Sequence, residues 1–331
     1  MRWNGRGTFY ARLMAKTAVI TGGAGFIGSH LARTLLGEGW GVRIVDDFST
    51  GTSANVAAGA VLVEGDVRSA EIVGPACDGA EVVFHLAARV SIRQSVETFY
   101  EDADTNLMGT LNVLRSAAAA GVGRIVFASS MAVYADGEAG SLIGEGYPTR
   151  PVSPYGVAKL AAERYLLLLG PSLGVEPVVL RFFNTYGVGQ GYTPYVGVLT
   201  IFVTRILTGK PCTIYGDGLQ CRDFTHVEDI VRGCLLASRT PGAAGGVFNL
   251  GSGRGTTVAD LAELIRQRLG KGEFRHVERD SSELVYSVAD IDKASRVLGY
   301  GPRGELVDRI GEVIDSIARR VERSPAIREH G

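Results

Sequence analysis

The stretch Thr21-Gly22-Gly23-Ala24-Gly25-Phe26-Ile27-Gly28 decides the fold of this chain. It follows a short run rich in β-branched residues, Lys16-Thr17-Ala18-Val19-Ile20, which predicts a buried parallel strand. It precedes residues 29–36, whose leucines share one helical face. The glycines therefore lie in a strand-to-helix turn, where the backbone bends sharply and the helix N-terminus offers free N–H groups to a phosphate.

The next predicted strand indicates what this turn binds. A tight turn needs glycine whatever its ligand, and the spacing of Gly22, Gly25 and Gly28 differs from the standard Gly-x-Gly-x-x-Gly fingerprint. The strand at residues 42–45, however, ends in Asp46, 18 residues after Gly28. An acid about 20 residues on binds the adenosine ribose hydroxyls of NAD and repels the 2′-phosphate of NADP. Although Asp46 could instead be a helix N-cap, the combination predicts an NAD site.

The composition restricts the class of protein. A formal net charge of −1 gives no general attraction to nucleic acid or to an anionic membrane. No apolar run approaches the roughly 18 residues that a spanning helix needs. The cysteines show no metal-binding spacing; they are Cys77, Cys212, Cys221 and Cys234. We therefore expect a cytoplasmic protein with reduced thiols, no metal, and neither nucleic acid nor membrane as a partner.

Strand-like and helix-like runs alternate through the first half of the chain. Further strands are expected at residues 61–67, 81–88, 124–130 and 175–183, and helices at residues 103–120 and 153–169. This alternation predicts an α/β fold with a doubly wound parallel sheet, the Rossmann architecture. Beyond residue 184 the rhythm loosens into loops that contain Gly, Pro and Tyr.

We predict four segments from this organisation. An N-terminal extension over residues 1–15 is expected to be disordered, and Met14 is a possible alternative start. The NAD-binding domain is expected over residues 16–183. A smaller C-terminal α/β domain over residues 184–320 should bind the substrate, with some interleaving with the sheet, before a tail over residues 321–331.

The helix at residues 153–169 is more apolar than one buried face requires. It either packs under the sheet or pairs with the 103–120 helix of a second subunit. The second alternative predicts a homodimer held by a four-helix bundle.

Candidate catalytic residues surround the start of this helix. Tyr155 and Lys159 are four residues apart and share one helical face, so the ammonium can stabilise a phenolate and lower its pKa. Ser130 ends the fifth predicted strand, at the edge where such sheets bind ligands. Tyr-x-x-x-Lys alone is common, but together with Ser130 it forms a proton relay beside a hydride carrier.

Several ordered motifs resemble those of the extended short-chain dehydrogenase/reductase superfamily, in particular its NAD-dependent nucleotide-sugar epimerases and dehydratases. The resemblance runs from about Lys16 to about Tyr300. The motifs are residues 21–28, His85-Leu86-Ala87-Ala88, Ser129-Ser130-Met131-Ala132-Val133-Tyr134, Tyr155-Gly156-Val157-Ala158-Lys159, Arg181-Phe182-Phe183-Asn184 and Arg222-Asp223-Phe224.

The resemblance implies roles for individual residues. Tyr155 is the catalytic base, Lys159 lowers its pKa, and Ser130 is the third catalytic residue. The residues expected to bind NAD are Gly22, Gly25, Phe26, Ile27, Gly28, Asp46, Asp47, Ser49, Thr50, Asp66, Val67, Leu86, Ala87, Ala88, Asn106, Ala128, Tyr155, Lys159 and Phe183. The residues expected to bind a nucleotide-diphosphate sugar are Ser130, Asn184, Val198, Leu199, Tyr215, Arg222 and Glu283. Arg222 would contact phosphate; its alternative is a surface ion pair with Asp223.

The resemblance also separates reaction types. Dehydratases and decarboxylases of this superfamily place a carboxylic residue just after the catalytic serine or threonine, where this chain has Met131-Ala132. Elimination is therefore disfavoured, and the chain is most similar to UDP-hexose 4-epimerases, which oxidise C4 and return the hydride to the other face. The alternatives are a UDP-glucuronate 4-epimerase, a reductase or dehydratase of another nucleotide sugar, and a non-catalytic NAD-binding protein.

The sugar and the nucleotide base stay open. Residues 181–187 resemble glucose/galactose-type enzymes, and Arg89 or Arg93 would have to meet a C6 carboxylate. Where the family shows Arg-x-Gly followed by an acid, this chain has Arg279 and Glu283 with one extra residue between them. Counting four residues from Glu283 puts Ser287 at the position beside the C2 substituent, which would admit an N-acetyl group.

Overall fold

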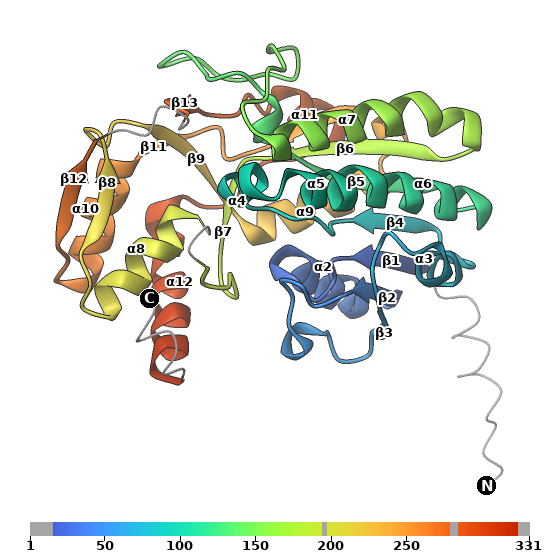
Figure 1. Ribbon diagram of the computed structural model, residues 1–331, viewed down its shortest axis with the longest axis horizontal. Coiled ribbons are helices and arrows are strands. Elements are labelled where there is room, and N and C mark those ends of the chain that lie inside the picture. Colours follow the sequence, from blue (N-terminus) through green and yellow to red (C-terminus); the bar gives the residue numbers. More distant parts are fainter. Residues whose placement is uncertain (1–15, 194–196, 279–283, 324–331) are drawn as a thin grey trace, which may run out of the picture.

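The computed structural model describes residues 16–193, 197–278 and 284–323, and its centre is a seven-stranded sheet (Figure 1). All neighbouring strands in it are parallel. In sheet order the strands are β10 (Val247–Leu250), β6 (Glu176–Phe182), β5 (Arg124–Ser130), β4 (Val82–His85), β1 (Thr17–Thr21), β2 (Gly41–Asp46) and β3 (Val61–Glu64). The predicted doubly wound α/β architecture is confirmed.

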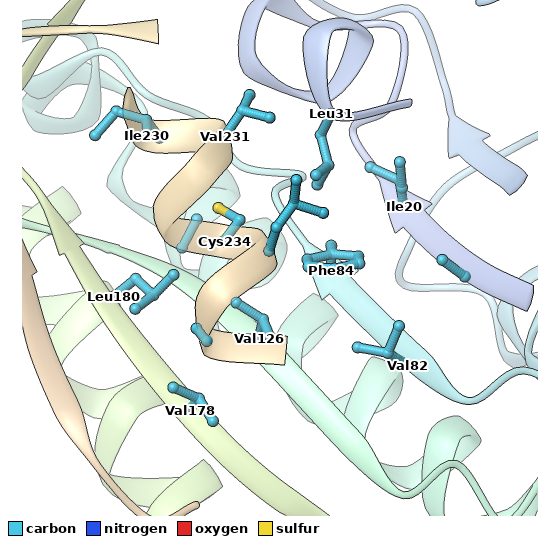
Figure 2. Packing of buried hydrophobic residues seen from close by; sticks show 14 of the residues in the cluster. Ile20, Leu31, Val82, Phe84, Val126, Val178, Leu180, Ile230, Val231 and Cys234 are labelled. Carbon is cyan, nitrogen blue, oxygen red and sulfur yellow. The ribbon is translucent and has the colours of Figure 1, made fainter. Parts of the chain in front are cut away.

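Helices cover both faces of this sheet. One face carries α2 (Phe26–Gly37), α9 (Val227–Arg239) and α11 (Asp292–Leu298), and the other carries α3 (Ala70–Cys77), α6 (Gly109–Ala119) and α7 (Pro154–Leu169). Consecutive strand residues point to opposite faces, so Ile20 packs with the first set of helices and Val19 with the second. Figure 2 shows Ile230, Val231 and Cys234 of α9 above the aliphatic side chains of the sheet.

Several element bounds differ from the sequence-based prediction. The third strand ends at Glu64 because Gly65 turns the chain at φ +157°, and the fourth ends at His85. The helix predicted at residues 103–120 begins earlier, as α5 (Phe99–Ala103), and passes through a π-helical turn, η2 (Asp104–Met108), before α6. Such a turn carries no separate sequence signal, and π-bulges are frequent at functional sites.

A smaller second unit lies beside the sheet, on the left of Figure 1. It contains α8 (Val198–Leu207), α10 (Val258–Leu269), α12 (Leu306–Arg323), β8 (Cys212–Tyr215), β9 (Cys221–His226), β11 (Gly255–Thr257), β12 (Phe274–Val277) and β13 (Tyr286–Ser287). Its β9 pairs with β7 (Asn184–Tyr186), which follows β6 almost directly. The carboxyl edge of the sheet therefore faces this unit.

The two units are interleaved in sequence. Strand β10 and helices α9 and α11 come from the region beyond residue 184, yet they complete the large sheet and its core. Within the described residues, no helix combines the length and the apolar character needed to cross a membrane.

Candidate active site

The glycine turn is built so that larger residues do not fit. Gly22 has φ +70°, and a Cβ on Gly28 would lie 2.2 Å from the Gly22 carbonyl oxygen. Gly25 is the N-cap of α2 and provides no side-chain cap, and the first turn of the helix, with Phe26 and Ile27, contains no acid. The first N–H groups of α2 therefore have no intrahelical acceptor and favour an anion.

Asp46 connects the end of β2 to this turn. Its Oδ2 accepts a hydrogen bond from Ala24 N (2.8 Å), and its Oδ1 accepts one from Phe48 N (2.9 Å). Burial raises the pKa of the Asp46 carboxyl. Beyond it, the exposed Asp47 accepts hydrogen bonds from the backbone and hydroxyl of Ser49, and Thr50 is also exposed. The predicted ribose-binding acid thus borders the predicted diphosphate turn.

Asp66 lies just after β3 and has a partner that the sequence did not indicate. Arg68 binds the Asp66 carboxylate (Nη2–Oδ2 2.5 Å) and also pairs with Asp104 of η2. The hydrogen bond from Arg68 lowers the pKa of Asp66. Because Asn112 Nδ2 donates to the backbone oxygen of Val67 (2.7 Å), this segment is fixed against α6.

A directed chain of hydrogen bonds runs through His85, for which the sequence suggested no role. The Thr110 hydroxyl donates to Asn106 O (2.7 Å), so it must accept from His85 Nε2 (2.9 Å). His85 Nδ1 then accepts from the Thr21 hydroxyl (2.7 Å), whose oxygen accepts from Ala87 N (3.3 Å). Burial lowers the pKa of His85 to about 3, so the ring is neutral and the chain is fixed in one direction.

Asn106, in the π-helical turn, holds the loop after β4. Its side chain accepts from Arg89 N (2.9 Å), and its Nδ2 donates to Arg89 O and to Asp102 Oδ1, both at 3.0 Å. Leu86, Ala87 and Ala88 therefore form a fixed, half-buried segment beside the glycine turn. The small side chains of Ala87 and Ala88 suit the close approach of a dinucleotide.

The structure brings Ser130, Tyr155 and Lys159 together. Ser130 is the last residue of β5, and its side chain is near enough to the Tyr155 phenol to lower its pKa. Helix α7 can approach because Tyr155 is followed by Gly156, where a Cβ would lie 2.3 Å from Ala132 O. Lys159 is fully buried one turn further along, and its Nζ donates to Ala128 O (2.9 Å). Ala128 belongs to β5 like Ser130, and Phe183, which follows β6, is also buried.

The electrostatics differ from the expectation that Lys159 lowers the pKa of Tyr155. Burial raises the pKa of Tyr155 to about 12, and the Ser130 side chain opposes this increase. Burial also lowers the pKa of Lys159 to about 8, while the charges of Asp102 and Glu163 act in the opposite direction. Spacing on a helix shows which groups are close, but it does not show how far burial outweighs their attraction.

A buried ion pair connects the elements that carry this site, and the sequence did not predict it. Arg181 of β6 binds Glu163 of α7 through Nε (2.9 Å) and Nη2 (2.6 Å). Ser129 donates to the same Glu163 carboxylate (2.5 Å), and the Arg181 guanidinium lies over the Tyr134 ring. Strand β5, strand β6 and helix α7 are thus tied together directly beside Ser130 and Lys159.

The predicted substrate residues lie along the boundary between the two units. Asn184 has a buried Oδ1 without a hydrogen-bond partner among the described residues. Val198 and Leu199 begin α8, whose N-cap Gly197 provides no side-chain cap and whose first turn contains no acid. Because the Leu199 side chain is buried, only its backbone can reach a ligand.

Tyr215 and Arg222 belong to the same boundary. Arg93 of helix α4 (Ile92–Glu97) lies over the Tyr215 ring, with Cζ 5.2 Å from the centroid. Arg222 is buried and donates to Cys221 O and Leu284 O. Asp223 instead accepts from the backbone of Ser252, Gly253 and Ala289.

The C-terminal part of the predicted substrate site is described only in part. Glu283, like Arg279, lies outside the described residues. Ser287 is fully buried on β13, and its hydroxyl has no hydrogen-bond partner among the residues that the structure describes. The Asp136 carboxylate accepts from Val285 N (2.8 Å) and Tyr286 N (3.0 Å), so it holds this segment against the loop after β5.

Comparison with known proteins gives the family. Residues 18–251 match the NAD dependent epimerase/dehydratase family. The chain belongs to this family. It is 36% identical to a putative UDP-glucose 4-epimerase of Methanocaldococcus jannaschii, over 90% of this chain and 97% of the relative.

Solved structures of similar proteins agree with this assignment. A Thermotoga maritima UDP-glucose 4-epimerase with UDP-glucose matches at 33% identity and a TM-score of 0.87, covering 92% of this chain and 99% of that one. A UDP-N-acetylglucosamine 4-epimerase of Methanobrevibacter ruminantium, in complex with UDP-N-acetylmuramic acid, matches at 29% identity and a TM-score of 0.86, with the same coverage of both chains.

NAD, the cofactor of the family, fits the residues described above. The uncapped N-terminus of α2 and the close approach at Gly28 suit a diphosphate. The Asp46 carboxylate at the end of β2 suits ribose hydroxyls. The prediction of an NAD-dependent epimerase/dehydratase family member is confirmed.

Proposed function

We propose that this protein interconverts UDP-hexoses that differ at C4, with UDP-glucose and UDP-galactose as the first pair to test. One observation carries the proposal: Ser130, Tyr155 and Lys159 converge at the carboxyl edge of the sheet, while Met131 and Ala132 are apolar and buried where a dehydratase has an acid. The relay can exchange a proton with a hydroxyl, but the two positions after Ser130 supply no acid for elimination.

The three residues would divide the proton transfer. Bound NAD would supply the group that accepts the hydride from C4 and gives it back. Tyr155 would take the proton of the 4-hydroxyl during oxidation and give it back after the 4-keto sugar has turned its other face. Ser130 would hold the same oxygen, since its side chain lies near the Tyr155 phenol. Lys159, held by Ala128 O, would supply positive charge beside them.

The remaining predicted residues would hold the cofactor and the nucleotide. We assign the diphosphate of NAD to the residues of the glycine turn and its adenosine ribose to Asp46. The diphosphate of the substrate would meet the backbone at the start of α8 and the Arg222 side chain, since an uncapped helix N-terminus and a guanidinium both favour phosphate. Asn184 would direct its buried, unpartnered Oδ1 to a donor on the substrate.

The arginines favour a neutral hexose over a uronate. Arg89 donates to the Thr98 hydroxyl (3.3 Å), and Arg93 lies over the Tyr215 ring, so both are engaged with the protein. The small Ser287 supports a second substrate pair that carries an N-acetyl group at C2, UDP-GlcNAc and UDP-GalNAc.

We also propose a homodimer, in which α7 pairs with the α5–α6 region of a second copy. Large apolar side chains on these helices are exposed, Tyr100 to 75% and Leu168 to 74%. Phe99, Met108 and Val157 extend this face. A two-fold pairing would bury these side chains, which a monomer would leave in contact with water. Light scattering should give twice the chain mass, and Leu168→Glu should shift the protein toward monomer.

A cytoplasmic location is our further proposal. All four cysteines are free and buried, and burial raises the pKa of Cys77 to about 11 and of Cys234 to about 12. Such thiols suit a reducing compartment, in which no disulfide is needed.

Product analysis tests the function. The purified protein is incubated with UDP-glucose, UDP-GlcNAc and UDP-glucuronate, and the nucleotide sugars are separated by chromatography. We expect UDP-galactose from the first, whereas absence of a 4-epimer from all three would refute the proposal.

A further inference from the structure

Asp102 is a buried carboxyl beside the relay that the proposed mechanism does not use. It lies on α5 with 1% of its surface exposed. Its Oδ1 accepts from Asn106 Nδ2 (3.0 Å), but its Oδ2 is buried without a hydrogen-bond partner among the described residues. A buried carboxylate oxygen without a hydrogen-bond partner lowers the stability of the fold, so its presence at this position calls for an explanation.

The groups around Asp102 suggest this explanation. Helix α5 packs against α7, which carries Tyr155 and Lys159. The Lys159 ammonium carries three N–H groups that can donate. Among the described residues, Nζ donates a hydrogen bond to Ala128 O. Asp102 acts on both relay residues through its charge and raises the pKa of each.

We propose that Asp102 is a positioning residue whose carboxylate keeps the Lys159 ammonium charged in the relay. This role deepens the proposed function and rests on Lys159 belonging to the relay. Asn106 orients the carboxylate through Oδ1, and Oδ2 stays without a hydrogen-bond partner among the described residues.

The other charged groups around the relay are few. His85 on β4 is neutral, since burial lowers its pKa to about 3. Glu163 also raises the pKa of Lys159, but its carboxylate is shared by Arg181 and Ser129. Arg89 opposes the rise that burial causes in the pKa of Asp102. Asp102 is therefore the carboxylate near Lys159 whose charge no ion pair neutralises within the described residues.

The direction in which Asp102 shifts the pH dependence follows from its charge. Removing the Asp102 charge lowers the pKa of both Lys159 and Tyr155, so both limbs of the pH–activity profile should move to lower pH. The effect on stability separates this role from a structural one. Loss of a structural residue would lower Tm, whereas loss of the Asp102 charge should not. Burial raises the pKa of Asp102, so the folded chain binds this proton more tightly than the unfolded chain. The carboxyl therefore lowers stability as the pH rises, and a neutral replacement should keep or raise Tm at pH 7.

The test compares Asp102→Asn with Glu101→Gln, the exposed neighbour on the same helix, and with Lys159→Met, all as NAD-loaded enzyme. We expect Asp102→Asn to move both limbs of the kcat profile down by roughly one pH unit, which raises kcat about tenfold on the acid limb and lowers it about tenfold on the alkaline limb. KM should stay at the wild-type value, and Tm should not fall. Glu101→Gln should match the wild type in kcat, KM and Tm. Asp102→Glu, which keeps the charge, should retain the wild-type profile.

The outcomes separate the two proposals. Full activity of Lys159→Met would refute the relay itself. An inactive Lys159→Met beside a wild-type profile for Asp102→Asn would overturn only the role of Asp102. Equal losses of activity and Tm in Asp102→Asn and Asp102→Glu would show a structural role and would also overturn it.

Discussion

The Ser130 side chain lies near the Tyr155 phenol at the junction between β5 and α7, and it opposes the rise that burial causes in the pKa of Tyr155. Two local features bring them together. Ser153 caps α7 by accepting from Gly156 N (3.1 Å), and the missing side chain at Gly156 lets the helix start against Ala132. The start of a helix, and not a loop, therefore places Tyr155 beside Ser130.

Tyr155→Phe removes the proposed acid/base group and keeps the ring. We expect kcat to fall by about 10²–10⁴-fold, because general acid–base catalysis contributes that much. Bound NAD, measured after denaturation, should be unchanged. Tyr165→Phe, at a half-exposed position on the same helix, is the control and should keep wild-type turnover. Near-normal turnover of Tyr155→Phe would assign the base to another residue.

Ser130→Ala removes the side-chain hydroxyl that lowers the pKa of Tyr155. The phenol should then be harder to deprotonate, so the limb of the pH–rate profile that reports Tyr155 should move to higher pH and kcat should fall. Ser130→Thr keeps a hydroxyl and should restore most of the activity. If the alanine variant moved neither limb, Ser130 would not act on Tyr155.

Gly28→Ala tests the glycine turn. The added Cβ would lie 2.2 Å from the Gly22 carbonyl oxygen, so the turn must shift, which we expect to cost about 1–3 kcal/mol of stability and most of the NAD affinity. Gly37→Ala, at the other end of α2 with open space around it, should be neutral or stabilising by up to about 1 kcal/mol. Thermal unfolding and NAD titration compare them. Equal effects of the two variants would contradict this account.

The Arg181–Glu163 pair should show strong coupling. Arg181→Met leaves a buried carboxylate without its partner and should cost about 3–5 kcal/mol, whereas the double variant with Glu163→Gln should recover much of this loss. Lys16→Met, at an exposed pair with Glu81, should cost less than about 1 kcal/mol. Denaturant unfolding measures the wild type, Arg181→Met, Glu163→Gln, the double variant and Lys16→Met. Additive losses in the cycle would show that the pair is not coupled.

The sequence was sufficient to predict features that depend on residues close together in the chain. The glycine turn, Asp46 and the Tyr155–Lys159 spacing each lie within one strand–helix unit, so their neighbours follow from strand and helix periodicity. Ser130 could be placed beside them because parallel strands end at one edge of the sheet.

Contacts between distant elements could not be predicted in this way. Arg68 reaches Asp104 across 36 positions and Arg181 reaches Glu163 across 18, from elements whose relative placement no periodicity gives. Asp102 is an ordinary acid on a helix until the π-helical turn and α7 bury it. The pKa of Tyr155 likewise depends on the depth of burial, which one helix does not reveal.

The central claim is that the protein inverts C4 by returning the same hydride, and isotope tracing tests it most directly. UDP-galactose deuterated at C4 is incubated with the purified protein in ordinary water, without added nucleotide cofactor, and the product is examined by NMR and mass spectrometry. The account predicts UDP-glucose that retains deuterium at C4 and has no solvent hydrogen there. Loss of the C4 label to water, or a product that has lost the elements of water, would contradict it.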